Sequence, residues 1–316
     1  MQIVKLPKWL SPSSLKALEK CPNTFYLQRM APDPWPYDKQ SPPAAVGSSF
    51  DALVKLQLIE TGVGSAEEIR DRVYADIYNP EDKARLKDAD LRQIMLECNI
   101  SPELKLEALT QGQIILDKYN FCRMNEKVKY VDLEIHKHWN LIQYTDMPVP
   151  LFMKLDAAVV GFTEDSDGAA NVRVQRTVPL DWKVTGYGSE KGVSPKQGYM
   201  CLMDGGLNKG PHKIFTENIA LDSIDEAWAM QICTYGWGLG IPVGLPFVGF
   251  IIQVCIRPTG MRFALFRGWV THDFQMALVK RYVDGWRSLM DGSFMERVAP
   301  TRDLAEITMI NSERWW

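Results

Sequence analysis

The sequence lacks closely spaced cysteines, a long apolar run and an apolar leader. Its six cysteines stand apart at positions 21, 98, 122, 201, 233 and 255 without a CxxC pair, and this scatter is typical of a reducing compartment. The first residues, MQIVKLPKWL, lack the apolar core of a signal peptide. No window reaches the roughly 18 uninterrupted apolar residues of a membrane span, because the best candidate, GIPVGLPFVGFIIQVCI, contains Pro242 and Pro246. These absences predict a cytoplasmic protein with no membrane segment.

An excess of positive charge is absent as well. The formal net charge is −3 at pH 7, which argues against a protein that coats nucleic acid without specificity. A local basic groove beside an acidic site would not be visible in that sum. The 316 residues, 46% hydrophobic and 24% charged, suffice for one large domain or for one domain with a sizeable insertion.

The N-terminal part of the chain has helical spacing. In LSPSSLKALEKCPNTFYLQRM, Ser11 is the expected N-cap and Pro12 the first helical residue, where its missing N–H costs nothing. The proline-rich stretch APDPWPYDKQSPPAAVG is expected to be non-helical as far as Gly47. Helical spacing then resumes in SSFDALVKLQLIE.

Three parts follow from these patterns. Residues 1–64 form a helical N-terminal part of the core. Residues 65–127 are charged and favour helix, with breaks near Asn79-Pro80 and Ser101-Pro102, and they form a helical insertion or subdomain. Residues 128–316 contain strand patterns and form the rest of the core, with a closing helix and a tail.

Strand patterns begin with KYVDLEIHKHW, VPLFMKLDAAVVGF and VRVQRTVPLDWKV. The turn TEDSDGAAN between the last two predicts an antiparallel hairpin. A helix, SIDEAWAMQICTYGWGLG, comes next, then the strands FVGFIIQVCI and MRFALFRGWV, and an amphipathic helix, HDFQMALVKRYVDGWRSLMDG. The alternation of strands and helices indicates an α/β protein.

Acidic and basic residues meet on one face of the predicted hairpin. In PLDWKVTG, strand alternation puts Asp181 and Lys183 on the same face and Trp182 on the other. If the hairpin has no bulge and centres on the Gly168-Ala169 junction, Asp156 lies directly opposite Asp181, with Cβ atoms about 5 Å apart. If Asp156 is left aside, the alternative interpretation of Asp181 and Lys183 is a salt bridge on a solvated face of the strand.

Two close carboxylates indicate a bound cation. They repel each other unless a proton or a cation compensates their charge. Oxygen ligands without thiolates or clustered histidines favour Mg²⁺ or Mn²⁺ over zinc. Such an ion can bind a phosphate oxygen and activate water, while Lys183 orients that water or neutralises developing charge. The chemistry indicated is phosphodiester hydrolysis.

The order of these motifs resembles the PD-(D/E)XK nuclease superfamily, within it the RecB-like and AddB-like exonuclease branch. The resemblance covers about residues 10 to 294, interrupted by the helical segment. After the N-terminal segment LSPSSLKALEKCPNTFYL, the matching positions are Gly47 with Asp51, Glu134 in VDLEI, Asp156 in KLDAAVV, Asp181 and Lys183 in LDWKVTG, and Gln231 with Tyr235 in QICTY.

The resemblance implies a restriction-endonuclease-like core, with a central mixed β-sheet flanked by helices and a helical N-terminal insertion. It implies Asp156 and Asp181 as metal ligands, helped by the Trp182 carbonyl, and Lys183 as the catalytic lysine. Gln231 and Tyr235 would contact the DNA backbone or brace the site. Whether Glu134 takes part or is only a strand residue stays open.

The chain departs from the family pattern in three places. Asp51 replaces a metal-binding histidine and remains a good oxygen ligand for Mg²⁺. Cys21 matches one ligand of an iron-sulfur cluster that some relatives hold, but no cysteine follows Cys255, so no cluster is expected and Cys21 is interpreted as a buried small hydrophobe. The segment from Lys183 to Gln231 is long for this family. Its lysines would contact DNA, cover the site or remain solvated: Lys191, Lys196, Lys209 and Lys213.

The expected function is a Mg²⁺- or Mn²⁺-dependent DNA nuclease, an exonuclease in particular, acting on linear ends or single strands. Recombination, repair or phage DNA processing in a bacterial or phage-infected cell would be its setting. The alternatives are a catalytically inactive nuclease fold used for nucleic-acid binding or assembly, and a phosphoesterase acting on RNA or small nucleotides. The terminal Trp315 and Trp316 are costly to leave in water, so they either pack back on the body or dock to a protein partner or oligomer mate.

Overall fold

The computed structural model describes residues 6–31, 40–77, 79–121, 128–142, 146–164, 173–185, 219–220, 225–257 and 260–298. They belong to two compact units. The larger unit comprises Lys39–Lys137 and Met153–Phe274, and the smaller unit comprises Met1–Asp38, His138–Phe152 and Gln275–Trp316.

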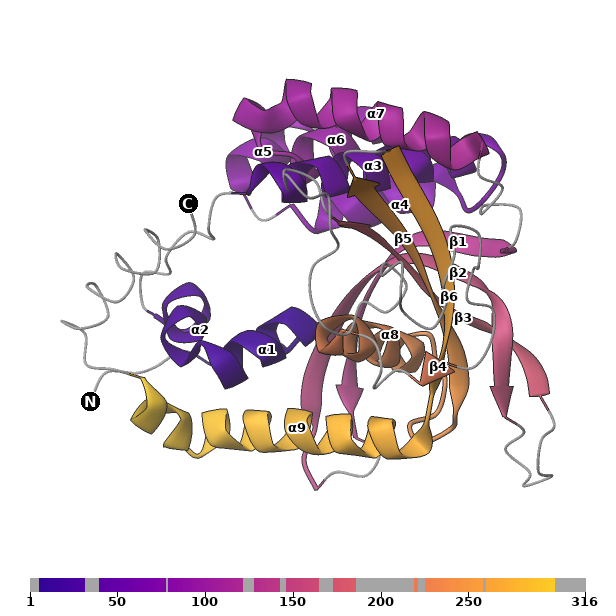
Figure 1. Ribbon diagram of the computed structural model, residues 1–316. Coiled ribbons are helices and arrows are strands. Elements are labelled where there is room, and N and C mark those ends of the chain that lie inside the picture. The colour runs from indigo at the N-terminus through magenta and orange to yellow at the C-terminus, as the bar shows by residue number, and fades with distance from the viewer. Residues whose placement is uncertain are drawn as a thin grey trace. The chain divides into compact units, whose positions relative to one another are not determined.

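A mixed sheet dominates the larger unit, with its described strands in the order β1-β2-β3-β5-β6-β4 (Figure 1). The pairs β2–β3 and β5–β6 are antiparallel, while β3–β5 and β4–β6 are parallel. The strands are β1 (Tyr130–Leu141), β2 (Val149–Glu164), β3 (Arg173–Thr185), β4 (Ile219–Ala220), β5 (Phe247–Arg257) and β6 (Gly260–Val270).

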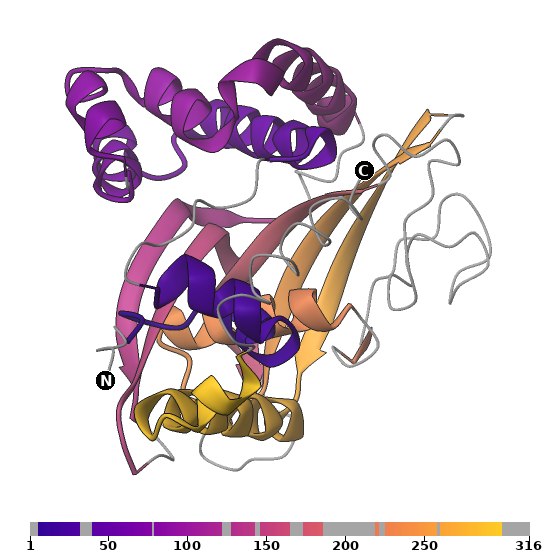
Figure 2. The same cartoon turned by 90° about the vertical axis from the view of Figure 1, so that its left-hand side faces the viewer.

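Helices flank this sheet, and the helices of the larger unit that precede β1, from α3 to α7, gather into a layer of their own (Figure 2). Within the layer α3 packs on α6 and α7, and α4 packs on α6; α3 also contacts β3. The helices are α3 (Pro42–Glu60), α4 (Ala66–Ala75), α5 (Pro80–Arg85), α6 (Leu91–Asn99), η1 (Pro102–Leu104) and α7 (Lys105–Phe121). The α/β class with a mixed central sheet flanked by helices is thereby confirmed, whereas the nuclease-like identity of this core stays a prediction.

Local capping explains where these helices begin. Ser65, Asn79 and Asp90 each accept a hydrogen bond from a backbone N–H of the first turn of α4, α5 and α6. The expected helical nature of residues 65–127 and the break at Asn79-Pro80 are confirmed for the residues described here. The break at Ser101-Pro102 is also present, since η1 begins at Pro102.

The expectation of a non-helical chain as far as Gly47 was wrong. Helix α3 already begins at Pro42, after the N-cap Ser41. A proline in the first turn removes only an N–H that has no partner within the helix, so the two prolines at 42 and 43 start the helix instead of preventing it.

The smaller unit contains α1 (Pro12–Lys20), α2 (Pro22–Arg29), the greater part of α9 (His272–Met290) and η5 (Ser293–Arg297). Ser11 caps α1 as predicted. Arg281 donates to both carboxylate oxygens of Glu19, at 2.7 and 2.5 Å, which ties α9 to α1. Cys21 separates α1 from α2 and is exposed, so its interpretation as a buried hydrophobe was wrong: a residue between two short helices faces outward.

The β2–β3 hairpin has the predicted register. Ala157 lies opposite Leu180 and the pairing continues without a bulge to Glu164 and Arg173. One further step in the same register places Asp156 beside Asp181. The alternation of the two strands therefore brings both carboxylates to one face, as expected from the sequence.

Several earlier expectations lie outside the described residues. They concern the lysine-rich segment between β3 and α8, apart from residues 219–220, and the terminal Trp315 and Trp316. Among the described helices, none has both the length and the apolar composition needed to cross a bilayer.

Helix α8 (Glu226–Gly238) interlocks with β5, and this contact predicts a stability effect. A β-carbon at Gly249 would overlap Cγ2 of Ile232 on α8. We expect Gly249→Ala to cost about 1–3 kcal/mol of unfolding free energy, because overpacking forces the helix away from the strand.

The matched control is Gly47→Ala. A β-carbon there lies at an ordinary 3.8 Å from Cβ of Val184, and alanine favours helix over glycine by about 0.5–1 kcal/mol. Urea titrations should show destabilisation for the first variant and none for the second. Equal stability of the two variants would contradict the packing of α8 on β5.

Candidate active site

Asp156 on β2 and Asp181 on β3 form the centre of the candidate site. The β2–β3 register, extended by one step, puts the two residues opposite each other. The backbone N–H of Trp182 donates to Oδ2 of Asp156 at 3.1 Å. Asp181 is 4% exposed, so its carboxyl group lies in a largely dehydrated place.

Lys183 stands next to this pair, two residues further along β3. Its ammonium forms an ion pair with Oδ2 of Asp181 and donates to Oε1 of Gln231 on α8 at 2.8 Å. Tyr235, one turn further along α8, is 6% exposed. The structure thus brings together four of the residues named from the sequence: Asp156, Asp181, Lys183 and Gln231.

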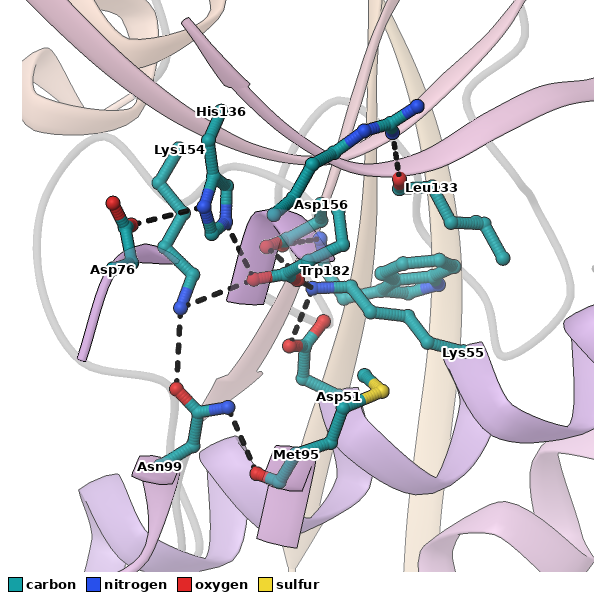
Figure 3. Close-up of polar contacts among 12 residues, drawn as sticks. Asp51, Lys55, Asp76, Met95, Asn99, Leu133, His136, Lys154, Asp156 and Trp182 are labelled. Carbon is teal, nitrogen blue, oxygen red and sulfur yellow. Dashed lines mark hydrogen bonds and ion pairs between the residues drawn. The ribbon is translucent and has the colours of Figure 1, made fainter. Parts of the chain in front are cut away.

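A second lysine, Lys55, was missed in the sequence interpretation and lies beside Asp156. Lys55 on α3 is fully buried, and its Nζ atom lies 2.6 Å from Oδ2 of Asp51 and 3.3 Å from Oδ1 of Asp156. It also forms an ion pair with Oε2 of Glu134 on β1. Three carboxylates from two strands and one helix therefore surround one ammonium group (Figure 3).

Glu134 is held in place by further cationic groups. Nε2 of His136 lies 2.8 Å and Nζ of Lys154 3.1 Å from its Oε1 atom, and on its other side His136 reaches Oδ2 of Asp76 at 2.9 Å (Figure 3). The backbone of Glu134 has φ 47°, in the left-handed region that a non-glycine residue seldom occupies inside a strand. Backbone strain of this kind persists where several surrounding contacts together hold the residue in place.

Acidic and basic groups alternate along this network, and their pKa values reflect it. Burial raises the pKa of Asp181 well above its usual range, and the charge of Asp156 adds to the effect against the opposing charge of Lys183. Burial acts in the same direction on Asp156, but the charge of Lys55 and the hydrogen bond from Asp181 lower the pKa of Asp156 below its usual value. The two neighbouring carboxyl groups therefore have pKa values shifted in opposite directions.

The groups around Lys55 titrate differently. Burial and the charge of Asp156 raise the pKa of Asp51 to about 7, despite the nearby Lys55. Burial opposes the charge of Lys55, yet the surrounding carboxylates raise the pKa of this lysine well above its usual value. Burial likewise opposes the ionisation of Glu134, but the charges of Lys55 and Lys154 hold the pKa of Glu134 well below its usual range. Lys55 is therefore a permanent cation.

The residues present suit one hard ion and not a cage of many ligands. In the described part of the chain, no three His, Cys, Asp or Glu side chains are grouped so as to hold a metal ion. Mg²⁺ is commonly held by only one or two carboxylates, with water and substrate phosphate completing its octahedron. Asp156 and Asp181 are opposed on adjacent strands, and the Trp182 carbonyl belongs to the same strand segment as Asp181. This pair therefore fits Mg²⁺ or Mn²⁺.

The missed residues carry recognisable signals. Lys55 is a lysine among the buried apolar residues of α3, four positions after Asp51 and hence on the same side of the helix. His136 and Lys154 lie two positions from Glu134 and Asp156, which puts each on the same strand face as its acidic neighbour. The signal that could have revealed these residues is a charged side chain at a position where the helix or strand pattern calls for an apolar one.

No protein-family model and no curated protein matches this chain. Among solved structures, one described as "Crystal structure of SSO0001" is similar at 12% sequence identity and a TM-score of 0.26, covering 75% of this chain and 84% of that one. The site must therefore be interpreted from its own geometry.

Removing the Lys55 ammonium should destabilise the fold. Lys55→Met keeps most of the apolar stem but removes the ammonium, which leaves the buried Glu134 and the half-buried Asp51 without this partner and costs about 3–5 kcal/mol of unfolding free energy. Lys16→Met removes an exposed lysine and should change stability by no more than about 0.5 kcal/mol. Urea titration of both variants makes the comparison; equal effects would show that the buried ion pairs contribute nothing.

Asp51 should make stability depend on pH. Its carboxyl group keeps a proton up to about pH 7 in the folded state but loses it near pH 3.8 when unfolded. Between these values the unfolded state binds fewer protons, so the free energy of unfolding falls as the pH rises. Asp51→Asn removes this contribution, and the stability of the variant relative to wild type should therefore increase from about pH 4 to about pH 7 and level off above that. A relative stability that stays constant across this range, in urea titrations, would contradict the raised pKa.

Proposed function

We propose that this chain is a divalent-metal-dependent DNA nuclease of the PD-(D/E)XK type, which hydrolyses phosphodiester bonds with Mg²⁺ or Mn²⁺. The observation that carries the proposal is the meeting of Asp156 and Asp181 on adjacent strands, with Lys183 paired to Asp181. The β2–β3 register is the one that the symmetry of the hairpin predicted.

In this proposal Asp156 and Asp181 hold the ion, with the Trp182 carbonyl as a further oxygen ligand. When bound, the ion supplies Lewis acidity toward a phosphate oxygen and lowers the pKa of water. Lys183 is fixed between Asp181 and Gln231, so its ammonium can orient water or neutralise charge that develops on the phosphate. Gln231 thereby positions Lys183, and Tyr235 braces the same helix.

Ends or single strands of DNA are the proposed substrate, with an exonuclease as the preferred form, in recombination, repair or phage DNA processing. A cytoplasmic setting and contacts through Trp315 and Trp316 belong to the same hypothesis. These points rest on the resemblance of the motifs.

A second candidate is a nuclease fold that binds nucleic acid or assembles with partners without cleaving. The observation in its favour is the ammonium of Lys55, which already pairs with three of the carboxylates near the site. If this candidate is right, the protein retards DNA in gel-shift assays but leaves it intact, and Asp181→Asn has no effect on that binding.

Nuclease activity is tested on end-labelled linear DNA, closed circular DNA and single-stranded oligonucleotides, with Mg²⁺, Mn²⁺ or EDTA. We expect degradation of linear or single-stranded DNA that EDTA abolishes. Asp181→Asn and Lys183→Met should each lower the rate at least about 10²-fold, because they remove a ligand charge and the ammonium that stabilises the transition state. Asparagine has nearly the same shape as aspartate, so Asp181→Asn mainly removes the charge.

The controls are Asp88→Asn and Lys16→Met, which change exposed residues of the same types. Both should retain wild-type rates. A wild-type protein that is inactive on every substrate, or site variants as active as the controls, would refute catalysis at this site.

A further inference from the structure

The position of Lys55 bears on how many metal ions the site can take. Two-metal nuclease sites hold their ions about 3.5–4 Å apart, and each ion needs carboxylate oxygens of its own besides the one that bridges them. The carboxylates available for a second ion are Asp51 and Glu134, with Asp156 as the bridge. All three of them face Lys55.

The same oxygen atoms would serve the ammonium and the second ion. Lys55 Nζ lies 2.6 Å from Asp51 Oδ2 and 3.3 Å from Asp156 Oδ1, and it is paired with Glu134 Oε2. A magnesium ion bound by these oxygens would lie about 2.0–2.1 Å from each of them. It would therefore need the space that the ammonium fills.

The surroundings fix the ammonium in this place. The Lys55 side chain is fully buried and belongs to a helix of 19 residues with an extensive apolar buried face. Glu134 cannot turn toward another cation, because His136 and Lys154 hold its Oε1 atom. On its opposite side Asp156 accepts a hydrogen bond from the Trp182 N–H through Oδ2 and adjoins Asp181 on the neighbouring strand, and this is the side away from the Lys55 ammonium.

We propose that Lys55 is the resident cation of the cluster formed by Asp51, Glu134 and Asp156, and that the site accordingly takes a single divalent ion, at Asp156 and Asp181. Asp51 then acts as a partner of Lys55 and is not a metal ligand. This inference deepens the proposed function and rests on it for the identity of the ion.

Calorimetric titration with Mn²⁺ tests the stoichiometry without any catalytic readout. We expect one ion for wild type and for Asp51→Asn, and none for Asp156→Asn. Lys55→Met, which empties the position of the ammonium, should gain one ion relative to wild type. Lys154→Met is the matched control: it removes the same charge from the other side of Glu134 and should gain none.

Reductive methylation of the wild-type protein, followed by mass spectrometry, keeps the test decisive if Lys55→Met does not fold. Lys55 should stay unmethylated with and without Mn²⁺, while the exposed Lys16 is modified in both. Methylation of Lys55 that appears on adding Mn²⁺ would mean that the metal displaces it, and the proposal would fall.

The outcomes separate this inference from the proposed function. Two ions in wild type, or no gain by folded Lys55→Met, overturns the role of Lys55. Absence of Mn²⁺ binding to wild type contradicts the metal-dependent nuclease, whereas the gain of one ion by Lys55→Met in that case still supports Lys55 as the resident cation.

Discussion

The ion cluster around Lys55 is the constraint on which the rest of the site depends. A lysine with no exposed surface is tolerated only when its charge is compensated, because dehydration of an ammonium costs several kcal/mol even after relaxation. Three carboxylates provide that compensation, and none of them comes from a neighbouring position in the sequence except Asp51. The cluster therefore forms only when α3, β1 and β2 are correctly assembled.

The fold accepts local strain to complete this cluster. Glu134 lies in the left-handed region within a strand, although an ordinary extended residue would pair better in the sheet. Its buried carboxylate receives contacts from Lys55, His136 and Lys154, each of which reduces the cost of burying its charge. The backbone strain at Glu134 and its ion pairs thus belong to one arrangement, in which Glu134 on β1 pairs with Lys55 on α3, far away in the sequence.

Sequence reasoning was effective where periodicity decides the structure. Strand alternation and hairpin symmetry were enough to place Asp156 beside Asp181, because an unbulged antiparallel pair has a single register. The order of motifs singled out Lys183 and Gln231, but their hydrogen bond to each other was not predicted. Neither strand periodicity nor the order of motifs predicted the Lys55 cluster, because no local rule tells which face of a helix meets β1. The positive φ of Glu134 also has no signature in the neighbouring residues. The start of α3 was misplaced because prolines were treated as helix breakers without regard to their position in the first turn.

The two sides of Asp156 differ in their surroundings, and this asymmetry defines the site. On one side lies the ammonium of Lys55, whose side chain is fully buried and is carried by α3. On the other side Asp156 adjoins Asp181, whose pKa is raised by burial and by the charge of Asp156 against the opposing charge of Lys183. In the proposed function a divalent ion would bind on this second side, because it would neutralise and ligate two neighbouring carboxylates. Lys183 pairs with Asp181 on the same side, so its ammonium would stand next to that ion.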